Sequence, residues 1–252
     1  QRFPYIIEKD DKGEILVKLA GRYFSPPEIS AIILEAIKSY GETYIEDDIS
    51  HAVITVPAYF GTRQKEVTRQ AGRLAGFSVL RVLPEPTAAA LAYGLDADPE
   101  EPKTVLVYDL GGGTLDVTVM FIGGGTFMDQ GKSGDMWLGG DDFDNRIVDD
   151  LVRVIQEQHR VDVRNLPNRK EIMLALKYKA ERAKIQLSNT TRTQIIIPGL
   201  VRAGGKIIDV EYELDRNRFN AMIQDLVKRS IDIVYEGIKK ANTTIEDIDT
   251  IL

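Results

Sequence analysis

Residues 104–122 read TVLVYDLGGGTLDVTVMFI, which is an apolar run, three glycines and a second apolar run. The β-branched and aromatic content of both runs predicts two strands, at 104–108 and 115–122. Between them the glycines predict a tight turn, because glycine adopts turn conformations without steric cost. Asp109 and Asp116 frame this turn.

The turn carries the chemistry of a phosphate site. Successive amides of Gly111, Gly112 and Gly113 can point into one concavity that suits phosphate oxygens, with the hydroxyl of Thr114 beside them. The two framing aspartates could hold a hydrated magnesium ion. The alternative is a plain hairpin turn, and the motif by itself leaves both interpretations open.

Two commoner nucleotide motifs fail on spacing. The triplet Gly131-Lys132-Ser133 looks like the end of a P-loop, but Thr126 stands five residues before Gly131, where that motif needs glycine. The glycine turn at 111–113 also lacks the third glycine of a dinucleotide fingerprint, and a strand follows it instead of a helix. A dinucleotide site is therefore not expected.

Composition limits the class of protein. A chain of 252 residues with 43% apolar content can form one large domain or two compact lobes. The net charge of -7 disfavours nucleic acid and anionic membranes as partners. Cysteine is absent from the sequence, which excludes disulfides and thiol chemistry and fits a cytoplasmic or another reducing compartment. No apolar run is long enough to cross a bilayer.

Strands and helices alternate along the rest of the chain. Residues 3–19 predict a hairpin, and the capping box that begins at Ser25 starts a helix to about residue 44. This order of elements predicts an α/β protein of two lobes. The further elements are strands at 51–56, 193–198 and 206–213, helices at 62–75, 85–94, 141–158, 168–188 and 216–240, and a linker at 96–103.

Two further sets of polar residues are candidates for a site. Glu181, Lys184 and Ser188 follow helical spacing, so one helix face offers an acceptor, a cation and a hydroxyl. Such a face is usually only solvated. Glu85 stands at a helix entrance, where it can be a cap or a general base.

Four motifs together resemble the nucleotide-binding domain of the DnaK-like, seventy-kilodalton heat-shock chaperones. They are VPAYF at 56–60, EPTAAALAYG at 85–94, DLGGGTLD at 109–116 and LGGDDFD at 138–144. The resemblance implies an actin-like ATPase fold of two lobes, each with a ribonuclease-H-like core. ATP or ADP, with Mg, would lie at the base of the cleft.

The resemblance also implies domain limits. The first lobe would span 1–103, with a small hairpin region at 1–25. The second lobe would span 104–252, with an outer subdomain at 144–215 between core segments at 104–143 and 216–252.

Roles follow for the residues that match the family's phosphate motifs. Gly111, Gly112, Gly113 and Thr114 would meet the β- and γ-phosphates. Asp109 would hold Mg through water, and Asp116 lies in the same loop. Glu85 would position the attacking water, so Glu85, Thr114 and Asp109 form the implied catalytic set.

The remaining matches surround the nucleotide or couple it to another domain. Pro57 would switch with the state of the γ-phosphate, with Lys65 as its partner. Residues implied to lie near the nucleotide are Gly139 and Gly140, together with Glu181, Lys184 and Ser188, which would contact ribose and adenine.

Three positions depart from the family pattern. Lys65 replaces an arginine, which keeps the charge but loses the planar fork. Trp137 stands where a histidine is common, and Ile185 where many members place an arginine over the adenine. Adenine stacking is then expected to be apolar or weaker.

The resemblance implies the ATP-binding and ATP-hydrolysing regulatory domain of a protein-folding chaperone of the stress response. Its partners would be unfolded peptide clients, held by a separate domain, a J-domain co-chaperone and a nucleotide exchange factor. The alternatives are a filament-forming actin-like ATPase and a chaperone-derived protein that binds nucleotide without hydrolysis.

The ends of the chain predict a fragment of a longer protein. It begins at Gln1 and stops at Leu252, in what reads as a starting strand. The family's first phosphate loop, its essential lysine and the later adenosine segment would then lie outside the chain. Because charge stabilisation drives phosphoryl transfer, the chain alone is expected to hydrolyse ATP poorly.

Overall fold

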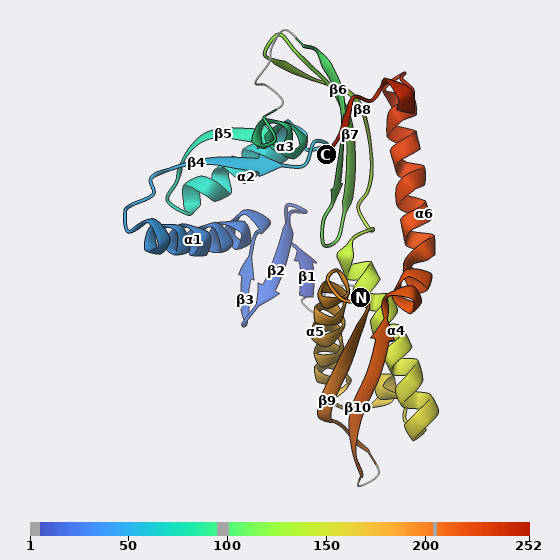
Figure 1. The fold of residues 1–252 in the computed structure, drawn as a ribbon. Coiled ribbons are helices and arrows are strands. Elements are labelled where there is room, and N and C mark those ends of the chain that lie inside the picture. Colours follow the sequence, from blue (N-terminus) through green and yellow to red (C-terminus); the bar gives the residue numbers. More distant parts are fainter. Residues whose placement is uncertain (1–5, 95–100, 204–205) are drawn as a thin grey trace. The chain divides into compact units, whose positions relative to one another are not determined.

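The computed structural model describes residues 6–94, 101–203 and 206–252. They fall into two compact units, the first made of residues 1–102 with 122–127 and the second of residues 103–121 with 128–252. Figure 1 shows the elements of both units. The predicted mixed α/β class is confirmed by the helices and the four separate sheets that the described residues form.

The first unit begins with the predicted hairpin. Strands β1 (Ile6–Lys9) and β2 (Ile15–Leu19) pair antiparallel around a turn in which the Asp10 carboxylate accepts hydrogen bonds from the amides of Lys12 and Glu14. A third strand that the sequence analysis did not predict, β3 (Arg22–Phe24), pairs with β2. Residues 3–5 of the predicted hairpin lie outside the described residues.

Helix α1 (Pro26–Ile45) follows the predicted capping residue. The Glu28 carboxylate accepts hydrogen bonds from both the amide and the hydroxyl of Ser25, each at 2.7 Å, which fixes the start of the helix. Helix α2 (Thr62–Leu74) packs beside α1. A small core forms between them from Ala31 of α1 and from Ala75 and Phe77, which follow α2.

A two-stranded parallel sheet completes the first unit. Strand β4 (His51–Val56) pairs with β5 (Ser78–Pro84), which the sequence analysis missed, and α3 (Glu85–Ala92) follows β5 directly. The register places Val56 opposite Pro84, so both strands reach their carboxyl ends at the same level.

The second unit contains the glycine turn in a four-stranded sheet of order β11-β6-β7-β8. Its strands are β6 (Lys103–Leu110), β7 (Leu115–Gly123), β8 (Thr126–Asp135) and the short β11 (Thr250–Ile251), which runs parallel to β6. Strand β8 was not predicted, and it contains the triplet at 131–133 that mimics a P-loop. Its extended backbone supports the exclusion of that motif.

Helices and a second sheet form the rest of this unit. Helices α4 (Gly140–His159) and α5 (Arg169–Leu187) pack against the antiparallel pair β9 (Arg192–Ala203) and β10 (Lys206–Asp215). Helix α6 (Arg216–Lys240) follows, and two short 3-10 helices lie at Val163–Asn165 and Ile245–Asp247. Twenty buried apolar residues from these elements form one continuous core.

Several predictions about organisation remain untested. The predicted linker at 96–103 lies largely outside the described residues. The lobe limits at 103/104, the subdomain limits at 143/144 and 215/216, and the actin-like architecture stay predictions.

Candidate functional site

The glycine turn is closed by its own backbone. The Gly111 amide donates a hydrogen bond to the Thr114 carbonyl at 2.9 Å, and this bond joins the end of β6 to the start of β7. Thr114 is half-buried, and its Oγ1 lies beside Gly111, 3.7 Å from where a Cβ would stand on that glycine. The sequence prediction of a tight turn is therefore confirmed, with the threonine hydroxyl held at its exit.

Steric crowding within the chain does not explain why positions 112 and 113 are glycine. Both are exposed, and a Cβ built on Gly112 or Gly113 would meet no atom of the described chain within 4 Å. Neither residue has the left-handed φ that favours glycine. Within residues 101–203 and 206–252, their amides also donate no backbone hydrogen bond. Bare amides beside open space are what a phosphate group needs for close approach.

The first turn of α4 is built onto this glycine turn. The amide of Gly140 donates to the Gly111 carbonyl at 3.0 Å, and the amide of Asp141 donates to the Gly112 carbonyl at 2.7 Å. The amides at the start of α4 lack partners within their own helix, so the turn's carbonyls satisfy two of them. The glycine turn and α4 thus form one hydrogen-bonded body.

Gly139 is required by this close packing. A Cβ on Gly139 would stand 2.5 Å from both the Gly112 carbonyl carbon and the Gly113 nitrogen, which no side chain can tolerate. A Cβ on Gly140 would lie 3.0 Å from Lys184 Nζ. The structure therefore brings the predicted residues Gly139 and Gly140 against the predicted turn.

Lys184 of α5 reaches the same place. Its Nζ donates a hydrogen bond to the Gly140 carbonyl at 3.1 Å and lies 2.8 Å from Oδ1 of Asp144, whose side chain is 3% exposed. This lysine is not the freely solvated cation that helical spacing suggests. Asp144 is the last residue of the LGGDDFD motif, but nothing in the sequence indicates that it would be buried against Lys184.

A groove lies beside Lys184. It has a volume of about 310 Å³ and combines side chains from α4, α5 and α6. Ser188 lines it, whereas Glu181 is exposed on α5 and does not. The sequence analysis missed the groove residues of α6, which follow helical spacing from the helix start: Arg216, Phe219, Asn220 and Ile223.

Arg216 ties the end of α5 to this groove. Its guanidinium donates hydrogen bonds to the carbonyls of Leu187, at 2.9 Å, and Thr190, at 2.8 Å. The carbonyl of Leu187, the last residue of α5, is thereby satisfied. Ile185, on the same helix, is 56% exposed and Trp137 is 52% exposed, so both departures from the family pattern present apolar surface to solvent.

The two aspartates of the turn differ in environment. Asp109 is exposed and Asp116 is half-buried. Burial raises the pKa of the Asp116 carboxyl, and the charge of Asp109 raises that pKa further. A cation near both groups would relieve this repulsion, so the pair fits a cation held between phosphate and carboxylate.

The other predicted residues lie in the first unit. Pro57 directly follows β4 and Glu85 directly follows β5, and the register of Val56 opposite Pro84 makes them neighbours at one sheet edge. Ligands of parallel sheets bind outside this carboxyl edge. Lys65 is half-buried in the first turns of α2, where its amide donates to the Gly61 carbonyl at 3.0 Å.

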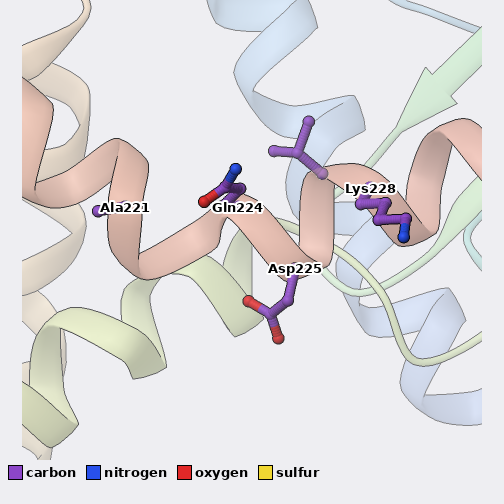
Figure 2. Close-up of a pocket in the computed structure, with 5 residues that line it drawn as sticks. Ala221, Gln224, Asp225 and Lys228 are labelled. Atoms are coloured by element: carbon purple, nitrogen blue, oxygen red, sulfur yellow. The ribbon is translucent and has the colours of Figure 1, made fainter.

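A second hollow lies along α6 (Figure 2). It is lined by residues of that helix alone, and Asp225 in its lining is paired with Arg146 of α4. It gathers no convergent set of polar groups. In the described part of the chain, no three acidic or histidine side chains gather as a metal site, and no helix is long and apolar enough to span a membrane.

Comparison with known proteins identifies the family. The family described as Hsp70 protein matches residues 1–252. The chain belongs to the Hsp70 family. It is 48% identical over 236 residues to the chaperone protein DnaK of Mycoplasma mobile, a match that covers 94% of this chain and 39% of that relative. The chain thus spans about two fifths of the length of this curated Hsp70 relative.

Proposed function

We propose that this chain is the ATP-binding part of an Hsp70 chaperone, with an actin-like fold, and that its glycine turn holds the phosphates. The observation that carries the proposal is the open space at Gly112 and Gly113, where neither the chain nor the backbone conformation accounts for glycine. Phosphate oxygens would accept from the amides and from the Thr114 hydroxyl.

We assign the rest of the nucleotide to the groove beside α5 and the metal ion to the two aspartates of the turn. The groove beside Lys184 and Ser188 would take the adenosine, next to the turn that takes the phosphates. Asp109 and Asp116 would face a magnesium ion through water, and such an ion would neutralise charge on the phosphates. The raised pKa of Asp116 supports a cation here, because a cation favours the charged carboxylate.

For the complete protein we propose ATP hydrolysis coupled to the release of unfolded peptide clients, with a J-domain co-chaperone and a nucleotide exchange factor as partners in the cytoplasm. Glu85 would orient the attacking water, and its neighbour Pro57 would pass the state of the γ-phosphate to Lys65. The shared strand edge of Pro57 and Glu85 supports this pairing. The chain covers 39% of its DnaK relative. The roles of the complete protein are therefore proposed from the family.

The phosphate role is tested by Gly113→Ala in the full-length protein. The added methyl group fills the space that the phosphate would use, so ATP affinity measured by titration calorimetry should fall about tenfold or more. The fold should be unaffected, since no described atom lies within 4 Å of the new Cβ. Gly61→Ala is the matched control, because its Cβ meets only Gln64 Oε1 at 3.8 Å. Unchanged ATP affinity in Gly113→Ala would reject the phosphate turn.

Hydrolysis is tested separately with Glu85→Gln. If Glu85 orients the water, the single-turnover rate should fall about 100-fold or more while ATP affinity stays the same. A rate close to that of the unaltered protein would assign Glu85 to capping α3 instead. Absence of turnover in the unaltered full-length protein would favour a chaperone-derived protein that binds without hydrolysis.

A further inference from the structure

The ion pair between Asp144 and Lys184 is the strongest feature near the site that the family roles leave unexplained. Asp144 lies in the second turn of α4, and 3% of its side chain is exposed. Burying a carboxylate is costly unless it is paired and hydrogen-bonded. Within the described residues, Oδ1 accepts no hydrogen bond with good geometry, although Lys184 Nζ lies 2.8 Å away. A buried group held in this way calls for a reason other than stability.

The partners of Lys184 supply that reason. Its Nζ bridges Asp144 and the Gly140 carbonyl, and the Gly140 amide in turn donates to the Gly111 carbonyl. The chain of contacts therefore runs from α5, through the first turn of α4, to the glycine turn. Lys184 also lines the groove between α5 and α6. One ammonium group thus links the groove to the turn.

We propose that Asp144 is a positioning residue, which holds Lys184 so that the α5 groove and the glycine turn stay at the spacing that one nucleotide requires. This inference rests on the proposed function. A ligand that spans both places gains affinity only when both are fixed relative to each other. A ligand that uses the groove alone does not depend on the link.

A second lysine provides a contrast. Lys177, two turns earlier on α5, lies 3.8 Å from Asp144 Oδ2, but its hydrogen bonds go to the Asp141 carbonyl and to Asn145. It compensates charge near Asp144 without touching Gly140. The link to the glycine turn therefore belongs to Lys184.

The experiment compares ADP with adenosine as probes in the full-length protein. Asp144→Asn keeps the size of the side chain and removes its charge. We expect its ADP affinity to fall about tenfold, while its adenosine affinity changes by less than about twofold. Lys184→Met breaks the same link from the other side. Because Lys184 also lines the groove, this variant should lower adenosine affinity as well, but less than ADP affinity. The double variant should lose no more ADP affinity than Lys184→Met alone, as residues acting through one contact do.

Lys179→Gln is the control, because it removes the same charge from α5 at a residue whose side chain makes no hydrogen bond or ion pair in the described part of the chain. It should bind both probes like the unaltered protein. Equal loss of ADP and adenosine in Asp144→Asn, or no loss of either, would overturn the positioning role. If the unaltered protein bound neither probe, the proposed function itself would fail. Should Asp144→Asn not fold, Lys184→Met decides the question, because only the positioning role predicts a larger loss of ADP affinity than of adenosine affinity.

Discussion

The two units contrast in how firmly they support their candidate residues. In the second unit, twenty buried apolar side chains from α4, α5, β9, β10, α6 and the short helix at Val163–Asn165 form one core. In the first, the described core cluster has three buried residues, and Pro57 and Glu85 sit at the end of a two-stranded sheet. Two parallel strands alone are marginally stable. The comparison of the two units shows that helices with the same apolar periodicity can bury their apolar residues to very different extents.

Helix α1 shows this best. Ile32, Ile33 and Ile37 keep the spacing of an apolar face, yet each is more than half exposed, whereas Ala31 is buried. In α5 the same kind of spacing buries Ile172 and Leu176 almost completely.

The largest expected effect comes from testing this contrast directly. Leu176→Ala removes a side chain with no exposure and should cost about 2–5 kcal/mol of unfolding free energy, through lost burial and a cavity. Ile33→Ala, 56% exposed, should stay within about 0.5 kcal/mol. Denaturant unfolding of the full-length protein, followed by hydrogen exchange in each unit, measures both. A cost for Ile33→Ala as large as that for Leu176→Ala would show that α1 is covered in the complete protein.

A half-buried carboxylate in the second unit, that of Asp150, should give the next effect. Asp150 accepts hydrogen bonds from the Tyr212 hydroxyl and from Arg218, at 2.7 Å for the latter, and pairs with Arg153. Burial alone would raise the pKa of Asp150, but the Tyr212 hydrogen bond and the two arginines outweigh it and lower that pKa. Because the folded pKa lies below the unfolded one, the stabilisation is present at neutral pH and is lost as pH falls below about 4.

Asp150→Asn should therefore cost about 1.5–3 kcal/mol at pH 7 and make stability less sensitive to acid. Unfolding free energies at pH 7 and pH 3 test this. Glu28 is the counterpart in the first unit: the Ser25 hydroxyl, then the Ser25 amide, lower the pKa of its fully exposed carboxyl. Glu28→Gln should also lower the unfolding free energy at pH 7, but by less than Asp150→Asn. If Glu28→Gln mattered more, the ranking of the two units would be reversed.

The smallest expected effect has the opposite sign and lies within the candidate site. Because the pKa of Asp116 is raised, the folded protein holds that proton more tightly than the unfolded chain, and ionisation at higher pH destabilises the fold. Asp116→Asn should raise the unfolding free energy at pH 7 by less than about 1 kcal/mol, since the group is partly exposed. Added Mg²⁺ with ATP should stabilise the unaltered protein more than the variant. Destabilisation by Asp116→Asn at pH 7 would contradict the environment described for this carboxyl.

Local signals explain what could be predicted from sequence. The glycine hairpin and the helices α1, α4, α5 and α6 follow from glycine punctuation, the Ser25 cap and periodicity, all of which act within a few residues. Strands β5 and β8 were missed for different reasons. β5, SVLRVLP, is interrupted by Arg81 and ends in proline, and β8, TFMDQGKSGD, is polar and contains two glycines. Their strand character depends on pairing with another strand, β4 for β5 and β7 for β8.

The candidate site was predictable only where its residues belong to local sequence motifs. Gly111–Gly113 and Gly139–Gly140 could be named from their motifs, but nothing in the sequence shows that Gly139 touches Gly112. The pairing of Asp144 with Lys184, forty residues apart, likewise arises only when α4 and α5 pack. The groove residues of α6 had a helical spacing that could have been noticed, without any sign of which helix they would face.

The bonds from Gly140 and Asp141 to the glycine turn have a mechanical consequence. They fasten the turn to the start of α4, a helix of 20 residues that is about 30 Å long at 1.5 Å per residue. A tilt of about 4° at the turn would sweep the far end of such a helix through about 2 Å. A ligand that shifts the glycine turn would therefore also move the far end of α4, at His159, which lies about 30 Å from the turn.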